Sequence, residues 1–227
     1  MNRLLDLKAL IHEGVEALKK YNSLAVPGII ADLAVLPVLI ALRNPMEDLR
    51  MLIVLVLANM SLSFFAFGTT TAMAREYTER GRTSLNTAAF IAKRLAPTLL
   101  ALSLLCPLVV LTGIIMYVLP GMIAGCFLMY AIPSVIADGL GPYEAIAQSI
   151  AMVRGNLAVS ARLFAAIVLS AMLFGVFGMF ISLIPVLGLL ANLVLQGAYM
   201  AVVSIVLFRA YKTLKKPVEP VADDDGE

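Results

Sequence analysis

One acidic residue, Asp32, stands near the middle of a long apolar stretch of the sequence. An aspartate at the centre of a membrane span costs about 2.5–3.5 kcal/mol to insert, so its side chain is seldom without a partner or a task. An ionising Asp32 would suit proton or ion coupling, whereas a neutral Asp32 would act as a hydrogen bond between helices. The sequence favours the structural interpretation, because a transporter core usually shows more than one acid.

Other polar residues fall at a similar depth on other apolar stretches. A helix rises about 1.5 Å per residue, which places Asp32 about 14 Å into the membrane. The residues predicted at the same level are Asn59, Ser170, Asn192 and Gln196. We therefore expect an intramembrane polar layer in which Asp32 contacts a polar side chain of another span. Asn59 is the nearest candidate, because it lies on the adjacent span.

No other set of residues in the sequence points to catalysis or metal binding. The single histidine, His12, has no visible partner, and the chain contains no Trp. Cys106 and Cys126 both lie within apolar stretches, where free cysteine behaves as a small apolar residue. We expect no enzyme activity, no metal and no cofactor.

The composition indicates which elements must position these residues. The chain has 227 residues, of which 61% are hydrophobic and 14% charged, whereas soluble domains are nearer half and a quarter. A span needs about twenty mostly apolar residues, and six stretches qualify. These are residues 23–42, 49–72, 95–118, 121–137, 158–181 and 183–208. The predicted fold is all-α, a polytopic bundle of six transmembrane helices, with a tight turn at 119–121 joining the third and fourth. Small residues such as Gly197 and Ala201 predict close helix packing.

The distribution of charge predicts the orientation. With six spans, 15 of the 17 Lys and Arg residues fall on one side, and only Arg43 and Arg50 on the other. The side rich in Lys and Arg is cytoplasmic. We therefore predict a multi-pass protein of the cell membrane with both termini in the cytoplasm. The basic residues belong to loops of a membrane protein, so they do not indicate nucleic-acid binding.

Segments outside the spans are predicted to be short amphipathic helices or a tail. Residues 1–22 form an interfacial helix with one apolar stripe. The membrane domain, residues 23–216, carries two further interfacial helices near 82–94 and 142–154, which look alike at an offset of sixty residues. Residues 217–227 are acidic and proline-rich, and we expect them to be disordered.

One of these segments, residues 133–156, resembles a known family. The matching positions are Pro133, Asp138, Glu144, Ser149, Gly155 and Asn156. The segment is similar to the membrane domain of glycerophosphoryl diester phosphodiesterase and to its uncharacterised six-span relatives. The resemblance implies the six-span fold but no phosphodiester hydrolysis, because the clustered His, Glu and Asp of the catalytic domain are absent. The residues themselves favour a simpler role, in which Glu144 and Ser149 only cap and hold an interfacial helix.

These observations predict a non-enzymatic integral membrane protein that organises lipid or assists a membrane complex. Its partners would be membrane lipids, with anionic headgroups at the basic cytoplasmic face. The sequence does not identify a protein partner. The alternative is a small proton- or ion-coupled transporter that works through the polar layer around Asp32. A water-accessible cavity that reaches Asp32 would distinguish the transporter from the lipid-organising protein.

Overall fold

The computed structural model describes residues 7–41, 49–184 and 187–215, and within them the chain is helical. The predicted acidic tail, residues 217–227, lies outside the described residues. The first half contains α1 (Leu7–Lys20), the short 3-10 helix η1 (Asn22–Ala25), α2 (Val26–Ala41), α3 (Leu49–Arg80) and α4 (Leu85–Arg94). The second half contains α5 (Ala96–Met116), α6 (Val118–Leu128), α7 (Ala131–Asp138), α8 (Pro142–Gly155), α9 (Leu157–Ile181) and α10 (Leu187–Leu214).

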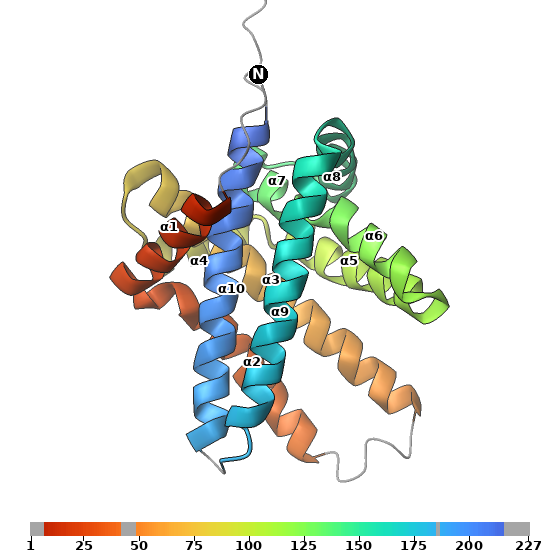
Figure 1. The fold of residues 1–227 in the computed structure, drawn as a ribbon. Coiled ribbons are helices and arrows are strands. Elements are labelled where there is room, and N and C mark those ends of the chain that lie inside the picture. The colour runs from red at the N-terminus through yellow and green to blue at the C-terminus, as the bar shows by residue number, and fades with distance from the viewer. Residues whose placement is uncertain (1–6, 42–48, 185–186, 216–227) are drawn as a thin grey trace, which may run out of the picture.

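The long helices form hairpins that spread away from a common end. Helices α9 and α10 run antiparallel, with α2 and α3 packed against α10, while the α5–α6 hairpin extends to one side (Figure 1). Helices α1, α4, α7 and α8 gather near the end of the bundle where α10 terminates (Figure 1). Among the described residues, α5, α6 with α7, α9 and α10 provide four segments long and apolar enough to cross a membrane. This arrangement fits a multi-pass membrane protein.

The amphipathic helices at this end are separated from the long helices by backbone breaks. Tyr21 has φ −133° and ψ 82°, which ends α1 before η1 and α2 begin. Gly139 has φ 70°, a left-handed conformation that glycine adopts without strain, and it terminates α7. Asn156, with φ −137° and ψ 42°, separates α8 from α9. Neither α1 nor α8 is therefore a continuous extension of a long helix.

The turn between α5 and α6 differs from the predicted position. The turn is predicted at residues 119–121, but the chain turns at Tyr117, whose backbone is extended at φ −161° and ψ 143°. Pro120 lies in the first turn of α6. Proline is tolerated there because the amide of a first-turn residue has no partner within the helix. The hairpin is tight, since a Cβ on Gly113 would lie 2.7 Å from Gly121 Cα.

The fourth predicted span, residues 121–137, is also interrupted. A turn at Met129 and Tyr130 divides it into α6 and α7. Tyr130 is fully buried, and its ring packs at a centroid distance of 6.3 Å from that of Tyr211 on α10. The break therefore lies inside the protein, where other side chains can satisfy the backbone groups that the helix no longer pairs.

The buried core is concentrated near the end that carries the amphipathic helices. Its members come from nearly every element, including Ala17 of α1, Met73 of α3, Val135 of α7, Ala145 of α8 and Phe208 of α10. The opposite halves of the long helices are exposed, and Met179 near the end of α9 is 75% accessible. In a bilayer these apolar surfaces would face acyl chains or another membrane protein.

Candidate functional site

No hydrogen bond joins Asp32 to another member of the predicted polar layer in the described part of the chain. Asp32 is half-buried on α2, whereas Asn59 on α3 and Gln196 on α10 are exposed. No hydrogen bond joins Asp32 to Asn59, although the side chains of both lie within the described part of the chain. The expected contact between these two residues therefore involves no hydrogen bond.

The packing of α2 explains this difference. A Cβ on Gly28 would lie 2.9 Å from Gly197 Cα, so α2 and α10 approach each other backbone to backbone. Asp32 follows Gly28 by four residues and shares its helix face. The face of α2 that carries Gly28 and Asp32 therefore lies toward α10. Equal depth in the membrane placed Asp32 and Asn59 at one level but did not define the direction in which either points.

The remaining members of the predicted layer have separate environments. Ser170 Oγ lies 3.1 Å from the Tyr199 hydroxyl, which donates a hydrogen bond of 2.7 Å to the Ile167 carbonyl and so links α10 to α9. Asn192 Oδ1 is buried against Gly178 of α9, where an added Cβ would lie 2.4 Å away. Tyr199 was not among the residues predicted for this layer. A tyrosine deep in an apolar stretch, whose hydroxyl needs a partner, is the signal that could have identified it.

The segment that carries the family resemblance, residues 133–156, forms a unit in which α7 and α8 are held together by hydrogen bonds. Glu144 accepts a hydrogen bond of 3.1 Å from the Gly141 amide, which caps the start of α8. Ser149 is buried and bridges the break between α6 and α7. Its hydroxyl donates to the Phe127 carbonyl at 2.6 Å and accepts from the Tyr130 amide at 3.1 Å.

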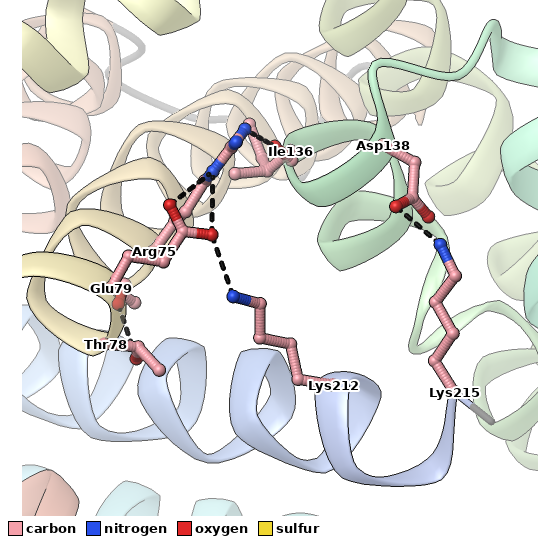
Figure 2. Close-up of polar contacts among 8 residues, drawn as sticks. Arg75, Thr78, Glu79, Ile136, Asp138, Lys212 and Lys215 are labelled. Atoms are coloured by element: carbon pink, nitrogen blue, oxygen red, sulfur yellow. Dashed lines mark hydrogen bonds and ion pairs between the residues drawn. The ribbon is translucent and has the colours of Figure 1, made fainter. Parts of the chain in front are cut away.

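The other positions of the segment also have structural contacts. Pro133 is buried in α7, and α8 ends at Gly155. Asn156 donates a hydrogen bond from Nδ2 to the Met152 carbonyl at 3.2 Å. Asp138, at the end of α7, accepts a hydrogen bond from the Tyr211 hydroxyl. It also accepts one of 2.6 Å from Lys215 Nζ (Figure 2). These contacts attach the α7–α8 unit to the end of α10.

A second polar group joins α3, α7 and α10. Glu79 forms ion pairs with Arg75 at 3.3 Å and with Lys212 at 2.8 Å (Figure 2). Arg75 also donates from Nη1 to the Ile136 carbonyl at 2.6 Å, near the end of α7. Partial burial raises the pKa of Glu79, but the hydrogen bond to Lys212 and the two cations outweigh it, so the net effect lowers the pKa below 4.5.

Most of the basic residues that the structure describes fall into two groups. The inner group pairs with carboxylates within the protein, as Arg209 does with Glu13 and Lys215 with Asp138. The outer group is exposed on the amphipathic helices and adjacent helix ends, and no ion pair is found for it in the part of the chain that the structure describes. We call this outer group the basic rim: Lys19, Lys20, Arg80, Arg82, Lys93, Arg94, Arg154 and Arg162.

Comparisons of the chain with protein-family models, curated proteins and solved structures found no match. The function is therefore argued from the geometry. The described residues contain no group of three or more His, Cys, Asp or Glu side chains that could hold a metal ion. What the arrangement offers chemically is a set of exposed cations beside apolar helix surfaces.

The lowered pKa of Glu79 predicts a dependence of stability on pH. Because the folded-state pKa lies below the unfolded value, the stabilising contribution is fully present above about pH 4.5 and is lost as pH falls through the lowered pKa. We expect Glu79→Gln to melt below the parent in detergent at pH 7. The difference should shrink on acidification toward pH 3.

The control for this measurement is Glu16→Gln. Glu16 pairs with His12 at 3.7 Å on α1, but its side chain is 64% exposed, and exposed pairs contribute little. This variant should melt close to the parent at pH 7. A gap between Glu79→Gln and the parent that stays constant down to pH 3 would contradict the assignment of the effect to the Glu79 charge.

Proposed function

We propose that this chain is a non-enzymatic integral membrane protein that organises anionic lipid at its basic face. In this proposal the chain crosses the cell membrane six times, with both termini in the cytoplasm. Helices α1, α4 and α8 then lie at the inner interface, where the headgroups of anionic lipids are found. The family resemblance of residues 133–156 agrees with this layout but carries none of the argument.

The basic rim is the observation that carries the proposal. Structural cations such as Lys212 and Arg209 are neutralised by carboxylates of the protein. The rim cations instead remain exposed on helices that surround one end of the bundle (Figure 1). A cation near an anionic leaflet contributes about 1 kcal/mol of attraction, and several act together.

The alternative, a transporter that works through Asp32, has less support. Asn59 and Gln196 are exposed, and the Ser170 hydroxyl is hydrogen-bonded to the Tyr199 hydroxyl. In the described part of the chain, Asp32 makes no hydrogen bond to the other members of the predicted layer. The hydroxyl and carboxylate groups with clear contacts, such as Ser149 and Asp138, hold helices together.

The proposal is tested by extracting the full chain in polymer nanodiscs and comparing the retained lipid with the bulk membrane. We expect enrichment of anionic lipid around the parent. Neutralising Arg80, Arg82, Lys93 and Arg94 to glutamine should reduce that enrichment, by up to about fivefold for each cation lost. In the control variant, each of these arginines is replaced by lysine and the lysine by arginine. The charge is preserved, so the enrichment should be preserved as well.

Two results would contradict the proposal. The first is a parent protein whose retained lipid matches the bulk composition. The second is dissipation of a proton gradient by the parent in liposomes, with loss of this activity in a folded Asp32→Asn variant. The second result would favour the transporter.

A further inference from the structure

A groove of about 310 Å³ lies between the α5–α6 hairpin and α8. Its walls are apolar apart from one charged residue, Arg154. The groove is lined by Leu105 and Val109 of α5, Phe127 of α6, and Ile146, Ile150 and Arg154 of α8, among others. A volume of this size is at the lower end of the range for small-molecule pockets.

The spacing along α8 explains the composition of this wall. Ile146, Ile150 and Arg154 follow one another at intervals of four residues, so they form one stripe along the helix. The stripe is apolar for two turns and ends in a guanidinium group at the last turn of α8. Arg154 is exposed and belongs to the basic rim, so its charge is available to a ligand.

We propose that this groove binds one glycerophospholipid, with an acyl chain along the apolar wall and the phosphate paired with Arg154. The inference rests on the proposed function and names a site for it. Arginine presents parallel N–H donors that match two phosphate oxygens, and its stem packs on apolar surface. The groove also adjoins surfaces that face lipid, because Leu104 and Leu108 of α5 are 61% and 50% exposed.

A second apolar groove supports this choice by comparison. It lies between α1, α9 and α10, has a volume of about 270 Å³, and is lined by residues such as Val15, Ile167 and Val202. Its walls carry the Ser170 and Tyr199 hydroxyls but no charged side chain. The groove beside α8 therefore combines an apolar channel with a partner for a phosphate, and the groove beside α1 does not.

The site is tested by native mass spectrometry of the full chain in detergent, stripped of endogenous lipid and titrated with phosphatidylglycerol. We expect one bound lipid, with about tenfold weaker binding in Arg154→Gln, since a hydrogen bond to a charged group contributes at least this much. Arg154→Lys should fall between the two. Arg94→Gln measures the loss of one rim charge alone, because Arg94 ends α4 and does not line this groove, and it should weaken binding less than Arg154→Gln does.

A second variant tests the acyl-chain part of the site while keeping the arginine. Ala124 of α6 lines the groove, and Ala124→Phe should fill it and weaken lipid binding. Glycerol phosphate, which lacks an acyl chain, should not displace the lipid. Displacement by glycerol phosphate, or equal binding by Arg154→Gln and Arg94→Gln, would overturn the site.

The failure of this inference can be told apart from failure of the proposed function. If Arg154→Gln binds lipid like the parent while anionic lipid remains enriched around the rim, only the groove assignment falls. If the parent binds no lipid in the titration and retains lipid of bulk composition in nanodiscs, both the groove assignment and the proposed function are wrong.

Discussion

Gly197→Ala is expected to destabilise the bundle by about 1–3 kcal/mol, the cost of overpacking a tight contact. A Cβ at this position would lie 2.7 Å from the Ala25 carbonyl oxygen and 2.7 Å from Ile29 Cγ1. The carbonyl belongs to the backbone of η1 and cannot rotate away, so the two helices must separate. SDS titration in mixed micelles should report the loss as an earlier unfolding midpoint.

Gly175→Ala on α9 is the matched control for this measurement. An added Cβ at Gly175 meets no atom within 4 Å, and alanine is a better helix former than glycine. This variant should unfold at or slightly above the parent midpoint. Equal midpoints for Gly197→Ala and Gly175→Ala would show that the contact between α2 and α10 does not limit stability.

Local signals in the sequence were enough to locate the ends of α8. Pro142 suits the first helical turn and Asn156 the stop, and the helix runs from Pro142 to Gly155. The role expected for Glu144 was also local, because a carboxylate at the third helical position reaches back to the amide that precedes the helix. Such features depend on residues within one turn of each other, so the sequence contains all of the information.

The contacts of Asp138 could not be predicted in the same way. Its partners Tyr211 and Lys215 are 73 and 77 residues away in the chain. Nothing in the sequence around Asp138 indicates that the end of α7 packs beside the end of α10. The prediction for Asp32 has the same limit, because the depth of a residue follows from counting but its direction depends on which helix packs against it.

The break in the fourth predicted span lies between these two cases, because it depends on a residue outside the span but not far along the chain. Residues 121–137 are mostly apolar and contain no charged residue, so hydropathy treats them as one helix. The polar group that makes the break possible, Ser149, lies on α8, 19 residues after Tyr130. A break in one apolar segment can thus depend on a single hydroxyl group supplied by another.

Ser149→Ala should therefore destabilise the protein by about 1–3 kcal/mol for each buried partner left unsatisfied. The Phe127 carbonyl and the Tyr130 amide both lose the hydroxyl that bonds them, at 2.6 Å and 3.1 Å. The site is buried, so water cannot easily replace the hydroxyl. The loss should appear as an earlier midpoint in SDS titration and as faster hydrogen exchange of the Tyr130 amide.

Thr112→Ala on α5 removes a hydroxyl that bonds only locally and so controls for the loss of the group itself. The Thr112 hydroxyl is exposed and donates to the Leu108 carbonyl of its own helix at 2.8 Å. Its removal should change stability by less than about 0.5 kcal/mol, because surface substitutions of this kind are nearly neutral. If Ser149→Ala proved as mild as Thr112→Ala, the break between α6 and α7 would not depend on α8, and the α7–α8 unit would be attached mainly through Asp138.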